Sequence, residues 1–281
     1  MIDKATNFRR ELKCAIDAAR AAGELVLRLR PTLTKQTKLD GSVVTNADFA
    51  SAQLIRDRLI TEFPHDAVLT EEDTDDHSRL GFERCWIVDP IDGTTAYVSG
   101  SDDFDIYIAL VENGVPVVAV THQPVTGMTI AAAKSSGVWC NDAENWQAAV
   151  VPNQLTPTVI VTRHWLGAPA NLQFIKDLSQ RIDAVAVRAA TGISARSFLQ
   201  PGIDAIVGVS VSDQPIGAKE WDIAPLDLIA RESGGWSSDL LGQPLIFNKP
   251  TPQFPTGLIL ARTPSLGEKI VTALRRNHLV K

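Results

Sequence analysis

The sequence contains few cysteines and no pattern that would use them. The three cysteines, Cys14, Cys85 and Cys140, are far apart and form neither a metal-binding pair nor a disulfide framework. Sparse cysteines are typical of a reducing compartment, so we expect a cytoplasmic location. No run of about 18 apolar residues occurs, and charged residues interrupt the first apolar ones. Neither a membrane span nor a signal peptide is therefore expected, and no membrane partner.

Basic residues are also too few to favour nucleic acid as the main ligand. Lysine and arginine number 27 against 33 aspartates and glutamates, and no basic block stands out. The sequence has no G-x-S-x-G motif and no P-loop lysine, and its five histidines are scattered. These absences exclude the common serine-nucleophile and P-loop chemistries. They leave direct attack by water as the expected route for a hydrolase.

The first half of the chain shows two helical patterns followed by a β-rich stretch. Apolar residues recur at spacings of three and four over residues 6–30, until Pro31, and again over 46–62. Short apolar runs then predict strands, two of which form a hairpin around Gly114. The predicted strands are 67–70, 85–88, 106–111, 115–121 and 129–133.

The second half alternates between the two kinds of element, which favours an α/β layer arrangement. The predicted strands are 158–162, 184–188, 205–209 and 257–261, and the predicted helices are 171–181, 192–200, 222–233 and 264–277. The polar segment 141–157 is the candidate boundary. We therefore expect an N-terminal α+β subdomain over 1–145 and a C-terminal α/β subdomain over 146–281, with a cleft between them.

Residues 86–95 place two carboxylates directly after an apolar strand. Asp89 and Asp92 are three residues apart, and Pro90 between them fixes a backbone dihedral, so the chain must turn there. The turn can bring both carboxylates and the carbonyl oxygen of Ile91 toward one point. Converging oxygen ligands suit a hard cation such as Mg²⁺. The alternative is a solvated Asp-Pro turn, but the ten-residue pattern as a whole favours the metal site.

The residues that follow this turn are suited to an anion. Gly93 lets the backbone approach a ligand closely. The amides of Thr94 and Thr95 would then open a helix or tight turn, an arrangement that binds phosphate.

Two further aspartates each begin a predicted helix and precede its buried face. Asp222 stands four residues before Leu226, and Asp48 stands four residues before Ala52. A carboxylate that points inward needs a cation or good hydrogen-bond donors. The alternatives are a helix N-cap for Asp222 and compensation of the helix dipole for Asp48.

Two acidic runs remain. Glu71 and Glu72 follow the strand 67–70, and we favour Glu71 as the inward residue because it comes first after the strand. The alternative for this pair is a solvated acidic loop. The other run is expected to form a solvated loop near the cleft without metal; it consists of Asp102, Asp103 and Asp105.

Taken together, these segments resemble the inositol monophosphatase superfamily of metal-dependent, lithium-sensitive phosphatases. The family pattern is an acidic pair after a strand, then Asp-Pro-x-Asp-Gly-Thr, then a Trp-Asp helix that ends in Gly-Gly. The matching segments are Val44 to Asp48, Glu71-Glu72, Asp89 to Thr94, and Trp221-Asp222 through to Gly234-Gly235.

The resemblance implies a mixed α/β (α+β) fold, a layered αβαβα sandwich, and a phosphomonoesterase with two or three Mg²⁺ ions. One metal would activate water while a second stabilises the leaving oxygen. Asp48 and Thr94 would orient and deprotonate the attacking water. The implied metal ligands are Glu71, Asp89, the carbonyl of Ile91, Asp92 and Asp222. The implied catalytic residues are Asp48, Thr94 and Glu71, and the implied phosphate-binding residues are Gly93, Thr94 and Thr95. A homodimer also fits the family.

The expected substrate is a small phosphate ester. Pro215 stands where inositol-type members carry an acidic residue that contacts substrate hydroxyls. The stretch 217–222, which includes Glu220, is more similar to the 3′(2′),5′-bisphosphate nucleotidase branch. Arg196 stands where that branch often has lysine and could meet a second phosphate, the alternative being a surface arginine on a helix. Arg196 and Glu220 are therefore predicted substrate contacts.

Other functions stay open. Inositol 1-phosphate, histidinol phosphate or a sugar phosphate are alternative substrates. A non-enzymatic role as an interaction partner of the transcription machinery is an alternative from a different class, and the complete acid set favours catalysis over it.

Overall fold

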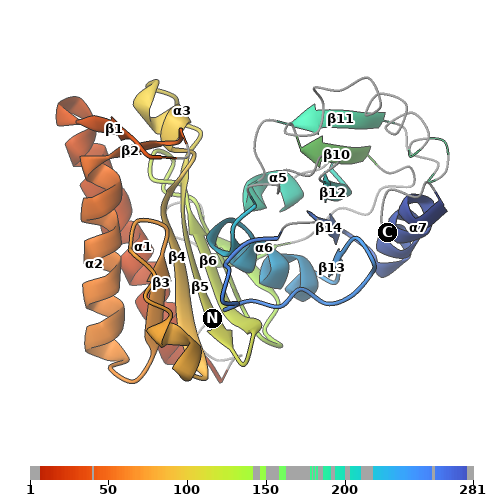
Figure 1. Cartoon of the computed structure of the whole chain (residues 1–281), viewed down its shortest axis with the longest axis horizontal. Coiled ribbons are helices and arrows are strands. Elements are labelled where there is room, and N and C mark those ends of the chain that lie inside the picture. The colour runs from red at the N-terminus through yellow and green to blue at the C-terminus, as the bar shows by residue number, and fades with distance from the viewer. Residues whose placement is uncertain are drawn as a thin grey trace.

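The computed structural model describes residues 7–39, 41–141, 146–149, 158–162, 178, 180, 182, 186–190, 194–199, 203–209, 218–254 and 257–276. Two long helices, α1 (Arg9–Leu29) and α2 (Asn46–Glu62), lie side by side and form the outermost layer (Figure 1). The buried face of α1 includes Leu12, Ala15 and Val26, so the helical period found in the sequence selects the side that packs. A 3-10 helix, η2 (Arg30–Thr32), and a small hairpin of β1 (Lys35–Thr37) and β2 (Val43–Thr45) connect the two helices.

A seven-stranded sheet forms the second layer, in the order β3-β4-β5-β6-β7-β8-β9. The first two strands are parallel and the remaining neighbours are antiparallel. The strands are β3 (Ala67–Thr70), β4 (Arg84–Asp92), β5 (Asp105–Glu112), β6 (Val115–His122), β7 (Thr129–Ala133), β8 (Val138–Asn141) and β9 (Trp146–Ala148). A 3-10 helix, η3 (Ser78–Gly81), precedes β4, and the short helix α3 (Thr94–Val98) follows it.

Both faces of this sheet are buried, and the two-residue period of its strands divides the side chains between two cores. On β4, Trp86 and Val88 belong to the core under α1 and α2. Cys85 and Ile87 belong to the core on the opposite face, which α6 (Glu220–Glu232) covers. A strand buried on both faces reads as a continuous apolar run, which is why 85–88 shows no alternation in the sequence.

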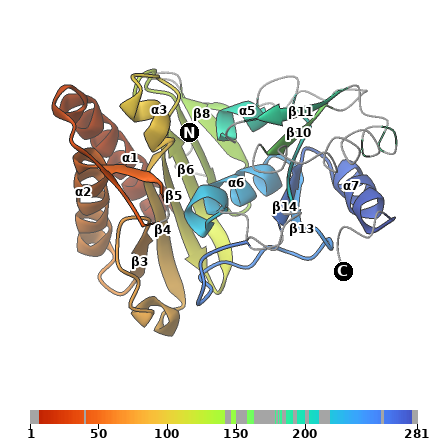
Figure 2. The same ribbon diagram turned by 45° about the horizontal axis from the view of Figure 1, so that its top comes forward.

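The remaining layers lie beyond α6, as Figures 1 and 2 show. A five-stranded sheet has the order β11-β10-β12-β14-β13. Leu258 and Leu260 of β14 face the α6 core, whereas Ile259 and Ala261 face α7 (Pro264–Arg276). The other elements are β10 (Thr158–Thr162), β11 (Ala186–Ala190), α5 (Ala195–Leu199), β12 (Ala205–Val209), β13 (Trp236–Asp239) and β14 (Gly257–Ala261). This order of helix, sheet, helix, sheet and helix confirms the predicted layered sandwich.

Several predicted bounds coincide with the structure, among them 46–62, 129–133 and 257–261. Within the predicted strand 184–188 the described residues begin at 186, and β11 continues to Ala190, two residues past the predicted end. Within the predicted helix 192–200 the structure describes α5, Ala195–Leu199. Most of the predicted helix 171–181 lies outside the described residues. The division at residue 145 stays a prediction, although β9 beyond it pairs with β8 in the first sheet.

In the described part of the chain, no helix is both long and apolar enough to cross a membrane.

Candidate active site

The end of β4 carries two aspartates that a break in the strand turns to the same face. Strand alternation places Asp89 with Ile87, on the face that α6 covers. The pairing with β5 then shifts between Asp89 and Asp92, as it does at a β-bulge. The shift sends the Ile91 side chain into the core under α1 and α2, and it leaves Asp92 on the side of Asp89. Pro90 lies within this irregular step, as its lack of an N–H would favour.

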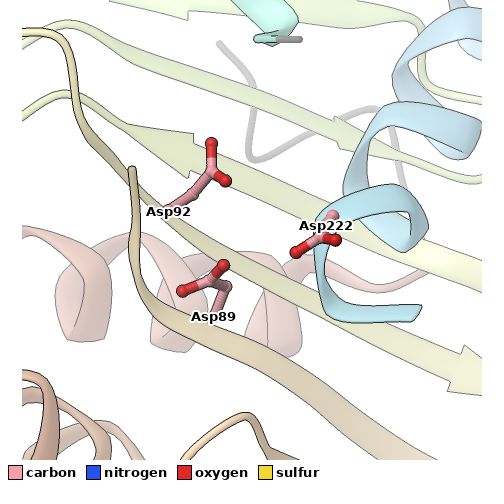
Figure 3. A group of neighbouring side chains, drawn as sticks. All are labelled: Asp89, Asp92 and Asp222. Atoms are coloured by element: carbon pink, nitrogen blue, oxygen red, sulfur yellow. The ribbon is translucent and has the colours of Figure 1, made fainter. Parts of the chain in front are cut away.

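The third aspartate comes from the first turn of α6. The carboxylate of Asp222 accepts a hydrogen bond from the backbone N–H of Lys219, at 2.9 Å between Oδ2 and N. Asp222 is therefore not the N-cap, the alternative considered for it. It is the third residue of α6 and bonds back to the N-cap residue, Lys219. One carboxylate oxygen from each of Asp89, Asp92 and Asp222 lies within 4.8 Å of the other two, and Figure 3 shows the three side chains gathered between the end of β4 and the start of α6.

These three carboxylates are crowded together, and burial together with their mutual repulsion disfavours their charged forms. Burial, reinforced by the charges of neighbouring acids, raises the pKa values of Asp89 and Asp92 well above their usual range. Burial likewise raises the pKa of Asp222 to about 7, although the backbone N–H and the charge of Lys219 act in the opposite direction. Among the described residues, no ion pair involves any of the three. Hard oxygen donors in this state fit a divalent cation such as Mg²⁺.

Glu71 approaches this cluster from the end of β3 without joining the group of oxygens within 4.8 Å. Its charge is the largest ionic contribution to the raised pKa of Asp89. Lys38, on the turn between β1 and β2, contacts both acids of the pair, with Nζ 2.9 Å from Oε1 of Glu71 and of Glu72. Glu72 is the more buried acid of the pair, with a side chain 4% exposed against 25% for Glu71. Glu71 is nevertheless the acid whose charge acts on Asp89, Asp92 and Asp222, so its choice as the residue that reaches the site stays a prediction.

Asp48 and Thr94 meet beside the acid cluster. The Thr94 hydroxyl lies 3.0 Å from Oδ1 of Asp48 and 3.0 Å from the carbonyl oxygen of Ile91, and it donates to one of them at a time. The backbone N–H and the hydroxyl of Thr45 donate to Oδ2 of Asp48, at 2.8 and 2.6 Å. Burial raises the pKa of Asp48, partly offset by these hydrogen bonds. Asp48 therefore caps α2 and also faces the site.

Gly93 is required by the backbone that leads from the cluster into α3. Its φ of 91° lies in the left-handed region that favours glycine. A Cβ at this position would lie 3.1 Å from the carbonyl oxygen of Asp103, which is tighter than ordinary contact. Thr95, in the first turn of α3, is exposed. The predicted phosphate-binding residues thus adjoin the acids at the end of β4.

Arg196 extends from α5 to β5 and pairs there with two aspartates. Its Nη2 lies 2.9 Å from Oδ1 of Asp103 and 2.9 Å from Oδ2 of Asp105. The expectation that Asp105 lies in a solvated loop was wrong, because it is buried at the start of β5, opposite Asp92. Burial raises the pKa of Asp105 to about 6, against the opposing effect of Arg196. Asp105 had no distinguishing signal beyond its place directly before an apolar run.

Two more residues stand apart from the predictions. Glu220 is fully buried, and its carboxylate accepts hydrogen bonds from the backbone N–H groups of Asn248 and Lys249, so the structure does not bring it into the acid cluster. Tyr107, which the sequence did not single out, lies opposite Asp89 on β5 and hydrogen-bonds the Asp92 carboxylate. The strand period alone would have placed Tyr107 on the same face as these acids.

Comparisons with known proteins agree with this fold. A family model described as the inositol monophosphatase family matches residues 8–279. A histidinol-phosphatase from Chlorobaculum parvum is 30% identical over 94% of this chain and 96% of its own length. A 3′-phosphoadenosine 5′-phosphate phosphatase from Mycobacterium leprae is 33% identical over 86% of this chain and 85% of its own.

Among solved structures, the extragenic suppressor protein suhB from Bartonella henselae superimposes with a TM-score of 0.74 and 25% identity, covering 95% of this chain and 98% of that one. The fold and the family match are thus those of a phosphoric monoester hydrolase. The chain belongs to the inositol monophosphatase family.

Proposed function

We propose that this chain is a magnesium-dependent phosphatase that hydrolyses a 3′(2′),5′-bisphosphate nucleotide. The observation that carries the metal-dependent part is the convergence of Asp89, Asp92 and Asp222, whose oxygens lie within 4.8 Å of one another. Three carboxylates at this spacing repel a phosphate ester as well as one another, and divalent cations remove both repulsions. The oxygen of Ile91 and the nearby carboxylate of Glu71 complete the proposed ligand set of two or three ions.

Bound divalent cations would lower the pKa of water and neutralise charge on the phosphate. The protein's own contribution is to hold that water and to accept its proton. Thr94 donates to Asp48, so its hydroxyl oxygen is free to accept a hydrogen bond from the water in turn. The raised pKa of Asp48 makes its carboxylate a better proton acceptor than an ordinary aspartate. We assign the backbone of Gly93, Thr94 and Thr95 to the phosphate.

The choice of a bisphosphate is supported by Arg196. Its guanidinium pairs with Asp105, which lies opposite Asp92 in the sheet, and its side chain is 16% exposed. Its Nε is buried and finds no hydrogen-bond partner in the described part of the chain. A second phosphate group would use that donor and compete with Asp103 for the guanidinium. The named similarity to a 3′-phosphoadenosine 5′-phosphate phosphatase favours the same substrate.

A second candidate is histidinol phosphate, favoured by the relative of that activity that matches almost the whole chain. A role beside the transcription machinery would leave the acids without a use, so we rank it below both. Homodimerisation remains a proposal by family likeness.

The test is a phosphate-release screen of the full chain with Mg²⁺. The substrates are adenosine 3′,5′-bisphosphate, inositol 1-phosphate, histidinol phosphate and fructose 1,6-bisphosphate, with D89N as the inactive control. We expect the highest kcat/KM for the bisphosphate. We also expect R196Q to lower that value roughly 10- to 100-fold, as loss of a charged hydrogen bond would, with a smaller effect on histidinol phosphate. Preference for histidinol phosphate would favour the second candidate, and no turnover of any ester would overturn the proposal.

A further inference from the structure

A second group of buried charges shares the first turn of α6 with the acid cluster. Glu220 is the first residue of α6 and stands two residues before Asp222. Its Oε2 accepts from the backbone N–H of Asn248 at 2.6 Å, and its Oε1 accepts from that of Lys249 at 3.1 Å. The Lys249 ammonium lies 2.9 Å from the same Oε1. Asn248 has a φ of 55°, and successive N–H groups around such a residue converge on one anion.

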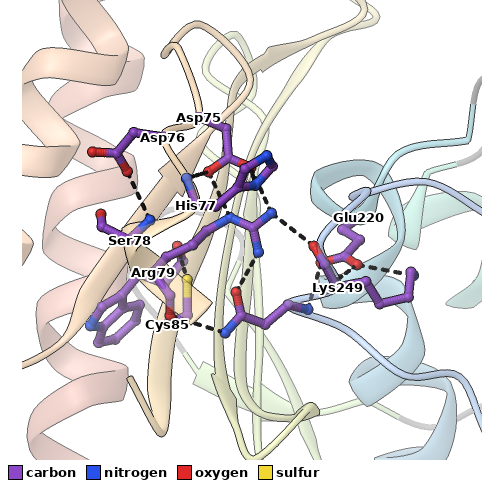
Figure 4. A network of polar contacts seen from close by, with 10 residues as sticks. Asp75, Asp76, His77, Ser78, Arg79, Cys85, Glu220 and Lys249 are labelled. Atoms are coloured by element: carbon purple, nitrogen blue, oxygen red, sulfur yellow. Dashed lines mark hydrogen bonds and ion pairs between the residues drawn. The ribbon is translucent and has the colours of Figure 1, made fainter. Parts of the chain in front are cut away.

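Arg79, in η3, joins this group to the segment that follows Glu71. It donates to both carboxylate oxygens of Asp75, at 3.1 and 2.7 Å. It also donates to the side-chain oxygen of Asn248 at 2.6 Å and to the carbonyl oxygen of Lys249 at 2.8 Å. Figure 4 shows the guanidinium between these two sets of partners. The Arg79 side chain is only 4% exposed, so water does little to weaken these contacts.

The contacts form a continuous path between two arms of the site. One arm is the segment from Glu71 to Asp75, and the other is the start of α6 that carries Asp222. Asp75 lies four residues after Glu71, which places Arg79 one short loop away from that acid. Glu220 fixes the α6 arm against residues 248–249, which Arg79 holds from the other side. A two-pronged arginine–carboxylate contact holds direction as well as distance.

We propose that Arg79 and Glu220 are positioning residues that set the spacing between Asp222 and the Glu71 segment, so that the metal-ligating carboxylates converge. This inference rests on the proposed function, because it assigns the spacing a role in binding the metal. Neither residue touches the acid cluster itself. They act through the residues that they hold, as outer partners of metal ligands do. Glu220 is thus assigned to support of the site in place of substrate contact.

The test compares Mn²⁺ binding by calorimetry for the full-length wild type, E220Q and the control R84Q. Arg84 also forms a half-buried ion pair, with Asp66 and Glu11, but at the opposite end of β4 from the acids. Thermal unfolding without metal is measured for each protein. We expect both variants to lose thermal stability, and only E220Q to weaken Mn²⁺ binding, by about 10- to 100-fold.

A second variant, R79K, keeps the charge but loses the two-pronged contact, so it tests the same spacing if E220Q does not fold. We expect it to weaken Mn²⁺ binding as well. The inference would be overturned if folded E220Q or R79K bound Mn²⁺ as tightly as the wild type while losing as much stability as R84Q. Both residues would then stabilise the fold without setting the metal site. A wild type that binds no Mn²⁺, or a D89N variant that binds it equally well, would instead overturn the proposed function.

Discussion

Two sets of buried charges flank the first turn of α6, and they are neutralised in opposite ways. On one side, Asp89, Asp92 and Asp222 gather with raised pKa values and no ion pair within the described residues. On the other side, Glu220 and Arg79 each meet several partners of opposite charge or dipole. A buried charge is costly unless it is paired. The first set therefore needs a proton or a cation, whereas the second is already complete.

This difference separates the proposed metal ligands from the residues that hold them in place. A search for buried acids alone would rank Glu220 with Asp89, since both are almost fully buried. Their partners distinguish them. Glu220 has an ammonium and two backbone N–H groups, whereas Asp89 accepts one backbone N–H, that of Ile91, and lies among other carboxylates. Changes on the two sides should accordingly have different consequences, beginning with the largest.

Removing one carboxylate from the crowded set should have the largest effect. We expect D89N and D222N to lower kcat/KM by more than the roughly 10²- to 10³-fold lost with a single transition-state contact. The metal-free variants should nevertheless unfold at a higher temperature than the wild type, because one repelling charge is gone. Phosphate release and thermal unfolding of the metal-free proteins measure the two effects. Lower stability in both variants would contradict the repulsion that the raised pKa values indicate.

Asp48 should contribute to the rate of the reaction and not to metal affinity. We expect D48N to reduce kcat roughly 10²- to 10⁴-fold, the usual contribution of a proton acceptor, with Mn²⁺ affinity close to that of the wild type. The matched variant T94V removes the hydroxyl that links Asp48 to the water and should reduce kcat in the same direction. Steady-state kinetics beside calorimetry separates the two quantities. A large loss of Mn²⁺ affinity in D48N would place Asp48 among the ligands instead.

The crowded set should also reverse the usual pH dependence of stability. Its carboxyl groups have higher pKa values in the folded than in the unfolded chain, so the folded chain binds more protons between the two values. The metal-free protein should therefore lose stability as the pH rises from about 4, the unfolded value, through about 7, the folded value of Asp222. Thermal unfolding across this window, with and without Mn²⁺, measures the effect. The loss should be smaller in D89N and should disappear with saturating Mn²⁺.

Lys38 should have the smallest effect, because it is a partly exposed cation at the edge of the crowded set. It occupies Glu71 and so competes with a metal ion for that carboxylate. We expect K38M to bind Mn²⁺ roughly two- to fivefold more tightly, in keeping with an ion pair worth less than about 1 kcal/mol. K13M is the matched control, since Lys13 pairs with Asp17 on α1 and faces solvent. Equal affinity in the two variants would remove Lys38 from the description of the site.

The features best predicted from the sequence are those that residues close together along the chain determine. The helix α2, several strands and the aspartates around Pro90 follow from local period and turn chemistry, and the layered sandwich follows from the family resemblance. The roles of Glu220 and Asp105 depend on partners 28 and 91 residues away, so their surroundings could not be read locally. The contact of Lys38 with Glu71 and Glu72 likewise depends on how the β1–β2 hairpin folds toward β3.

Diffraction from a crystal of the full chain soaked in Mn²⁺ tests the central claim most directly, because the anomalous signal of manganese marks its position. The account predicts a peak between the carboxylates of Asp89, Asp92 and Asp222, and no peak beside Glu220. Manganese bound elsewhere, or absent from these three aspartates at saturating concentration, would contradict it.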